Sequence, residues 1–139
     1  MVDTAMLAPA FALVGLTFAV WVRLYQLRVA EMRRRRIHPQ AIALSAQVAQ
    51  RLEDTRAADN FRNLFELPVL FYLALVVAVL AGLVTPVSLG LAWAFVLLRV
   101  AHSAIQCTYN RVMHRFCVFI AGALVLLALW LYLSLHLFL

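Results

Sequence analysis

The sequence predicts an all-α integral membrane protein folded as a bundle of four transmembrane helices. Of its 139 residues, 66% are hydrophobic and only 13% are charged, and the mean hydropathy is +0.94. Soluble domains carry about 45–50% apolar and about 25% charged residues. A soluble domain of about 150 residues buries only about 70% of the surface of its unfolded chain. Lipid must therefore cover part of this chain, which excludes a soluble enzyme. The length also excludes a transporter built from large repeats.

Segments without charges locate the expected helices. A membrane span needs about 20 consecutive apolar residues, and no charge occurs from Thr4 to Val22. The next uncharged run, 67–98, is too long for one helix, and Gly82 and Pro86 divide it. Residues 116–139 contain no Asp, Glu, Lys or Arg. We therefore expect one domain, residues 1–139, with spans at approximately 5–28, 61–82, 87–109 and 116–138.

The arginines predict the orientation of these spans. All 12 basic residues are arginines, and nine of them lie between Arg23 and Arg62. Arg111 and Arg115 lie between the third and fourth spans. The 83–88 connection between the second and third spans and both ends of the chain carry no Arg or Lys. Basic residues gather on the cytoplasmic side of a membrane. We expect both termini on the opposite side, with two connections in the cytoplasm, 29–60 and 110–115.

The basic charge balance has two possible explanations. A net charge of +6 and a pI near 10.4 would indicate a nucleic-acid partner in a soluble protein. Among long apolar segments the same charge indicates orientation and contact with anionic membrane lipids. The run Arg33–Arg36 has no interleaved aromatic residues, so we expect it to anchor lipid headgroups and expect no nucleic-acid partner. Cys107 and Cys117 fit no metal-ligand spacing, and no metal site is expected.

The long connection contains one further expected helix. The chain breaks at Pro39, after which Ile42, Ala46, Ala49 and Leu52 recur at helical spacing. We therefore predict a short helix on the cytoplasmic face.

Polar residues within the second and third spans are the candidate site. Ionisable residues in a span cost about 2.5–3.5 kcal/mol each on insertion scales, so they invite a functional explanation. Asn63 and Glu66 are three residues apart, which places them on one face of a continuous helix. Arg99, His102 and Gln106 form a polar stripe on the third span, which Asn110 continues. We expect Arg99 to pair with Glu66. A purely structural ion pair between helices is the alternative.

Further arginines lie at the expected cytoplasmic boundary. Arg111 and Arg115 are four residues apart at the entry to the fourth span, and Arg28 closes the first span. They either extend toward lipid headgroups or hold an anionic ligand. Together with the buried carboxylate, the arginines fit a multiply anionic ligand that is reached from the cytosol beside apolar walls.

The motifs resemble those of the MAPEG family, the membrane-associated proteins in eicosanoid and glutathione metabolism. The resemblance rests on four short spans, on RNLFELP at the start of the second span, and on RVAH in the third span followed by Arg115. The segment NFRNLFELPVLFY is most similar to the bacterial branch. Residue by residue the resemblance is confined to about 60–68 and 99–115.

The resemblance implies a homotrimer in which glutathione lies between neighbouring subunits near the cytoplasmic side. It implies a microsomal-type glutathione transferase or peroxidase that acts on lipophilic electrophiles, with Arg115 activating the thiol. A bacterial cytoplasmic membrane is the expected location. The implied glutathione-binding residues are Arg28, Arg62, Asn63, Glu66, Arg99, His102, Gln106, Tyr109 and Arg111.

Two departures from the family and one alternative function accompany this hypothesis. Gln106 stands where the eukaryotic members place a tyrosine, and Tyr109 follows three residues later. Phe116 and Phe119 stand where those members have polar residues.

The alternative is a non-catalytic trimeric membrane protein whose polar cluster binds an anionic lipid or another ligand, or only holds the helices together. The sequence leaves open the electrophile and the choice among conjugation, peroxide reduction and isomerisation.

Overall fold

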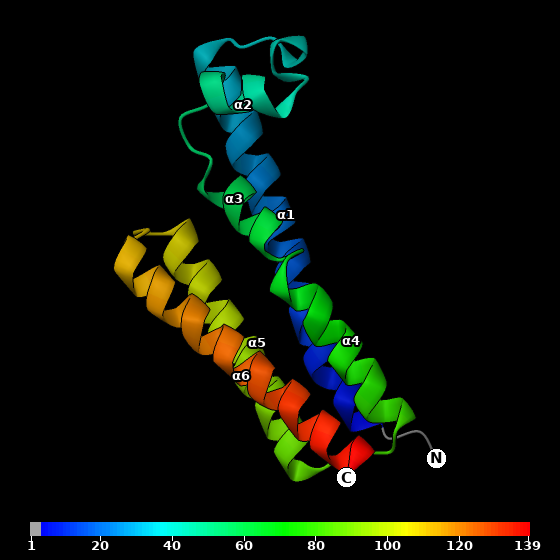
Figure 1. Ribbon diagram of the computed structural model, residues 1–139. Helices are drawn as coiled ribbons and strands as arrows, with labels where there is room; N and C mark the ends of the chain where they lie inside the picture. The colour runs from blue at the N-terminus through cyan, green and yellow to red at the C-terminus, as the bar shows by residue number, and fades with distance from the viewer. Residues whose placement is uncertain (1–3) are drawn as a thin grey trace.

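The computed structural model describes residues 4–139, whose regular secondary structure is helical, with no strand in that range (Figure 1). Four helical segments are long and apolar enough to cross a membrane, namely Thr4–Arg35, Arg56–Leu80, Pro86–Cys107 and Val112–Phe138. The predicted fold class, a multi-pass bundle of four membrane-spanning helices, is confirmed. The elements in chain order are η1 (Thr4–Met6), α1 (Leu7–Arg35), η2 (Pro39–Ile42), α2 (Ser45–Arg51), α3 (Arg56–Asn63), α4 (Leu67–Leu80), α5 (Pro86–Cys107) and α6 (Val112–Phe138).

The bundle consists of two helical pairs. One pair joins α1 to α3 and α4, which follow each other along its length, and the other is the α5–α6 hairpin (Figure 1). The η2–α2 segment packs beside the last turns of α1, while the C-terminus lies at the end where α1 begins (Figure 1). An even number of spans brings the C-terminus back to the end of the bundle where α1 begins. That the arginine-rich end faces the cytoplasm stays a prediction.

Apolar side chains hold the two pairs together. Leu13 of α1, Phe71 of α4, Phe95 of α5 and Leu129 of α6 are fully buried in one core. The rings of Phe71 and Phe95 stack with centroids 4.6 Å apart. In contrast, many large apolar side chains on the outer faces are exposed, which is appropriate where lipid replaces water as the solvent.

Helix α1 continues seven residues beyond Arg28, where the sequence placed the end of the first span. Arg35 donates to Glu31 four residues earlier, with Nη1 3.1 Å from Oε1, and basic residues in a last turn are stabilised by the helix dipole. The helix ends at Arg36, which adopts the left-handed conformation with φ 52°. The first helix therefore extends about 10 Å past the predicted boundary.

The second span is broken between α3 and α4. Pro68 lies in the first turn of α4, where its ring would clash with the carbonyl of residue 64 if one helix continued through. Glu66, directly before α4, is non-helical with ψ −102°. Asn63 is the last residue of α3, whereas Glu66 lies outside that helix, after the break. The expectation that they share one helix face is wrong.

The turns and the short helix follow the predicted punctuation. Gly82 ends α4 with φ +67°, a conformation that glycine adopts at little cost. Thr85 caps α5 by accepting from the Ser88 amide, and Pro86 is in the first turn. In the long connection a short helix does form, α2, which begins after η2 and residues 43–44; Ile42 ends η2 and Leu52 follows α2. That it lies on the cytoplasmic face stays a prediction.

Glu31 fixes the end of this connection to α1. Its buried carboxylate accepts from the backbone amide of Glu53 at 2.8 Å and from that of Asp54 at 3.4 Å. Arg35 holds the same region by donating to the carbonyl of Arg51 at 2.8 Å. Sequence reasoning missed Glu31, although the pair of Glu31 and Arg35 at i,i+4 was visible.

Glu31→Ala should free the 52–55 segment and leave the bundle folded. Hydrogen bonds to a charged group contribute about 1.5–3 kcal/mol, so amide exchange at Glu53 and Asp54 should accelerate by at least about tenfold. Hydrogen–deuterium exchange with mass spectrometry measures this rate. The control is Glu53→Ala, which removes an exposed carboxylate that only pairs with Arg35. Equal exchange in the two variants would contradict the anchoring role of Glu31.

Candidate functional site

Two neighbouring sets of buried and half-buried hydrogen bonds, here together called the polar ladder, join α3 to α5. Its members come from α3 and from one face of α5, and they are Asn60, Asn63, His102, Ser103 and Gln106. Hydrogen-bonded polar groups tolerate burial, whereas unsatisfied ones cost free energy. The ladder therefore explains how a polar stripe is accommodated on an otherwise apolar helix.

One set of these hydrogen bonds joins three residues that were predicted from the sequence, Asn63, His102 and Gln106. Asn63 Nδ2 donates to Gln106 Oε1 at 3.2 Å, and His102 Nε2 lies 3.0 Å from the same oxygen. Since Gln106 Oε1 is an acceptor, His102 Nε2 carries the proton in this arrangement. The opposite ring nitrogen, Nδ1, is then an acceptor, and it is buried without a hydrogen-bond partner.

The other set contains residues that sequence reasoning missed. Asn60 is fully buried; its Oδ1 accepts from Ser103 Oγ at 3.2 Å and its Nδ2 lies 3.5 Å from Cys107 Sγ. The signal was available, because Asn60 precedes Asn63 by three residues and Ser103 precedes Gln106 by three.

Arg56 fastens the start of α3 to the end of α5. Its Nη1 donates to the carbonyl of Thr108, directly after α5, where the helix dipole favours a cation. Its Nη2 pairs with Asp54 Oδ2 at 2.8 Å. The hydrogen bonds from this guanidinium hold the pKa of Asp54 below its ordinary value.

Arg99 is a buried cation. Only 2% of the residue is exposed, and among residues 4–139 neither Nη1 nor Nη2 has a hydrogen-bond partner. The guanidinium carbon lies 5.1 Å from the Phe95 ring and 5.0 Å from the Phe119 ring, so two aromatic faces enclose it. Gly122 of α6 packs beside it, since a Cβ there would lie 3.7 Å from Nη2, in ordinary van der Waals contact.

The predicted ion pair between Arg99 and Glu66 does not form. Glu66 lies exposed at the start of α4, and its carboxylate makes no ion pair or hydrogen bond with any residue in the 4–139 range. The helix break at 64–66 is the physical reason, since it carries Glu66 off the face of α3 that meets α5. The two charges interact only through the field between them.

The α5–α6 loop places three more candidate residues at the edge of the bundle. Arg115 donates from Nη1 to Asn110 Oδ1 at 2.9 Å, and Asn110 holds the left-handed conformation with φ 48°. Tyr109 Oη lies 3.2 Å from His114 Nδ1. Arg111 directly precedes α6 and is exposed. Arg115 and Arg99 both lie within electrostatic range of His102.

Arg28 and Arg62 meet in a separate place, a polar cavity of about 280 Å³ between α1, the η2–α2 segment and α3. Asp59 lines the same cavity, and its Oδ1 lies 3.9 Å from Arg62 Nη1. Thr55 and Ser45 add hydroxyl groups to the lining. The predicted residues therefore form two groups, one at this cavity and one around the ladder and the α5–α6 loop.

This distribution of charge suits an anionic ligand. Each of the two groups contains arginines, and the planar guanidinium of arginine binds carboxylates through two parallel hydrogen bonds. A fixed guanidinium also stabilises a thiolate, which is the nucleophilic form of a thiol. Among residues 4–139, His, Cys, Asp and Glu form no cluster of three that could hold a metal ion.

Comparisons with known proteins give one finding. A family model described as the MAPEG family matches residues 6–135 of the 139-residue chain. No curated protein and no solved structure matches.

Gln106→Leu should destabilise the protein by about 1–3 kcal/mol, because it leaves buried nitrogens of Asn63 and His102 without a partner. Adding Asn63→Leu should recover part of this loss, since both partners of one bond are then apolar. Unfolding in detergent micelles measures the free energies. Gln26→Leu, on the exposed face of α1, is the matched control. A Gln106→Leu variant as stable as this control would show that the ladder contributes nothing.

Proposed function

The chain belongs to the MAPEG family, and we propose that it is a glutathione-dependent membrane transferase or peroxidase acting on lipophilic electrophiles. The observation that carries the proposal is the buried Arg99 guanidinium, whose two terminal nitrogens have no hydrogen-bond partner among residues 4–139. A guanidinium does not lose its proton to escape the cost of burial. An anionic group that enters this position would satisfy it.

Glutathione supplies groups of the required kind. It has two carboxylates for arginine forks and a thiol with the ordinary pKa of about 8.5. In the proposal Arg99 and His102 hold one anionic end, and Arg28 and Arg62 attract the other from the cytoplasmic side. Glu66, being exposed and unpaired, is available to the amino group. Asn63, Gln106, Tyr109 and Arg111 complete the binding set.

Arg115 is proposed to stabilise the thiolate. Its charge near the sulfur favours loss of the thiol proton to water. In conjugation, the thiolate sulfur then forms a bond to an electrophilic carbon, and the leaving group departs with its electron pair. In peroxide reduction, a hydroperoxide becomes an alcohol and water while two glutathione molecules become one disulfide. The lipophilic substrate would enter from the bilayer, where such compounds concentrate.

A homotrimer in a bacterial cytoplasmic membrane is part of the proposal. Arg62, Glu66 and Arg111 are exposed in the single chain, so a neighbouring copy could complete the site around them. The 29–60 and 110–115 connections would then face the cytoplasm, and both termini the opposite side.

The alternative function is a non-catalytic trimeric protein that binds an anionic lipid. The observation that favours it is the end of α1, where Arg33, Arg34 and Arg36 are exposed within one helical turn of each other. Trp21 and Tyr25 lie on the preceding turns with their rings 5.0 Å apart, a combination typical of membrane interfaces.

Arg115→Ala should abolish thiolate formation and turnover while glutathione still binds. The thiolate absorbs near 240 nm, and titration calorimetry reports binding. Arg115→Lys should restore part of the thiolate signal, because it returns the charge. Arg34→Ala, which changes an exposed arginine outside the site, should behave as wild type. A full thiolate signal in Arg115→Ala would contradict the assigned role.

Arg99→Met should separate a binding role from a structural one. Because the guanidinium has no partner in the structure, its replacement by an apolar side chain should leave the unliganded protein as stable or more stable. Saturating glutathione should raise the Tm of wild type, by the equivalent of about 2.7 kcal/mol at 100 times Kd, and should not raise that of Arg99→Met. Arg34→Met is the control. An equal rise in Arg99→Met and wild type would contradict the proposal.

A further inference from the structure

The guanidinium of Arg99 is a positive charge that lies almost completely below the surface of the molecule. Only 2% of the residue is exposed, and among residues 4–139 no group accepts a hydrogen bond from Nη1 or Nη2. The guanidinium carbon lies 5.1 Å from the Phe95 ring and 5.0 Å from the Phe119 ring. These rings provide cation–π contacts, but they do not neutralise the charge.

The charged groups nearest to Arg99 leave the interior positive. Among residues 4–139 no carboxylate forms an ion pair with Arg99, and Glu66 acts on it only through the field between the two charges. Arg115 is a second cation, within electrostatic range of His102, which lies one turn after Arg99. The region between α5 and α6 therefore carries more positive than negative charge.

Burial determines what kind of anion can neutralise Arg99. A lipid headgroup or a carboxylate of another copy approaches a side chain through its exposed surface, and Arg99 has almost none. Gly122 of α6 already packs beside the guanidinium, since a Cβ there would lie 3.7 Å from Nη2. An anion of one atom therefore requires the least rearrangement. Water would satisfy the hydrogen bonds but would leave the charge uncompensated where the dielectric constant is low.

We propose that Arg99 binds one halide ion, such as chloride, between α5 and α6 in the protein without glutathione. The ion accepts hydrogen bonds from Nη1 and Nη2 and acts as the counterion of the guanidinium. An anionic end of glutathione displaces the halide, because the further contacts of glutathione stabilise the rearrangement that a larger group requires. This displacement rests on the proposed function, whereas the halide site does not.

Thermal unfolding in detergent micelles without glutathione tests the halide site. Replacing sodium methanesulfonate by sodium chloride at constant ionic strength should raise the Tm of wild type, because a ligand that binds only the folded state stabilises it. Bromide should act like chloride, and fluoride should be much weaker, because its hydration water is the hardest to remove. Arg34→Met, which removes an exposed arginine, should respond as wild type. The same Tm in chloride and in methanesulfonate would overturn the site.

Three variants assign the chloride dependence to one side chain. Arg99→Met should lose it. Gly122→Asp places a carboxylate beside Nη2 and supplies a counterion from the chain itself, so its Tm should no longer depend on chloride. Gly122→Asn has the same shape without the charge and should retain the dependence. Equal chloride dependence in wild type and Arg99→Met, or in Gly122→Asp and Gly122→Asn, would overturn the assignment.

Competition with glutathione tests the displacement. The apparent Kd of glutathione in titration calorimetry should about double at a chloride concentration equal to the Kd of chloride itself. The NMR line width of chloride, which broadens when the ion binds, gives that second Kd and should narrow again when glutathione is added. An unchanged Kd of glutathione in a protein whose Tm depends on chloride would overturn the displacement alone.

Failure of this inference and failure of the proposed function are distinguishable. Chloride binding that depends on Arg99, without any binding of glutathione, would retain the halide site and remove the transferase proposal. Glutathione turnover in a protein whose Tm and chloride line width show no halide binding would do the reverse.

Discussion

A permanent positive charge inside the bundle is the constraint on which the rest of the interior depends. The guanidinium of Arg99 lies buried in a span where a charge costs about 2.5–3.5 kcal/mol even on insertion scales. The fold places Phe95 and Phe119 on its two faces, and each such contact returns about 0.5–2 kcal/mol. Among residues 4–139 no acidic side chain forms an ion pair with Arg99.

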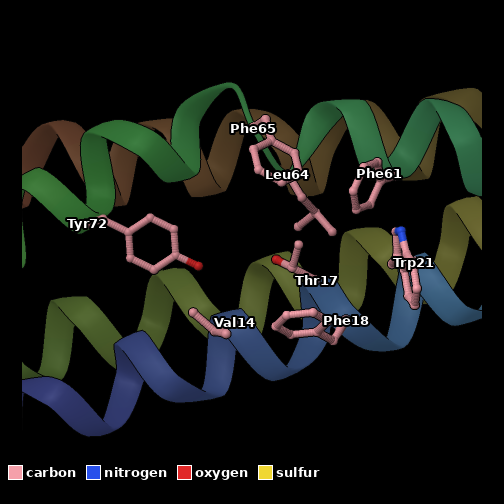
Figure 2. Close-up of a pocket in the computed structure, with 8 residues that line it drawn as sticks. All are labelled: Val14, Thr17, Phe18, Trp21, Phe61, Leu64, Phe65 and Tyr72. Atoms are coloured by element: carbon pink, nitrogen blue, oxygen red, sulfur yellow. The ribbon is translucent and has the colours of Figure 1, made fainter.

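The polar ladder determines how α3 lies against α5. Since hydrogen bonds cannot be exchanged with water inside a bilayer, Asn60 and Asn63 must meet partners on α5, and this fixes how α3 lies against it. The break before α4 then separates two environments within a few residues. Before the break, the Asn63 amide donates into the ladder. At the break, Leu64 and Phe65 line an apolar cavity between α1 and the α3–α4 segment (Figure 2).

Spacing along the sequence predicted contacts only where the helix was continuous. On α5, which runs unbroken, His102 and Gln106 do interact, and Asn63 reaches Gln106. Across the break the same reasoning failed, because helical spacing no longer tells which side chains share a face once the helix is interrupted at residues 64–66. Glu66 therefore lies exposed instead of pairing with Arg99. Glu31 escaped notice for a related reason: its partners are backbone amides of a segment about 20 residues later, and backbone groups leave no mark in a sequence.

The sequence by itself determined the solvent, the number of apolar helices and most of their ends. The composition indicates that lipid covers part of the chain. Uninterrupted apolar runs predict the helices, and Gly82, Pro86 and Pro39 mark positions where helices end or begin. The effects that end a helix are local, so the sequence alone reveals them. The tertiary structure alone decided which polar groups are satisfied. Whether Arg99 has a counterion, whether Arg28 and Arg62 face one cavity, and whether aromatic residues of α1 and of the 61–72 segment enclose another depend on how helices distant in the chain approach each other. Such distances result from packing over the whole core, which no single segment encodes.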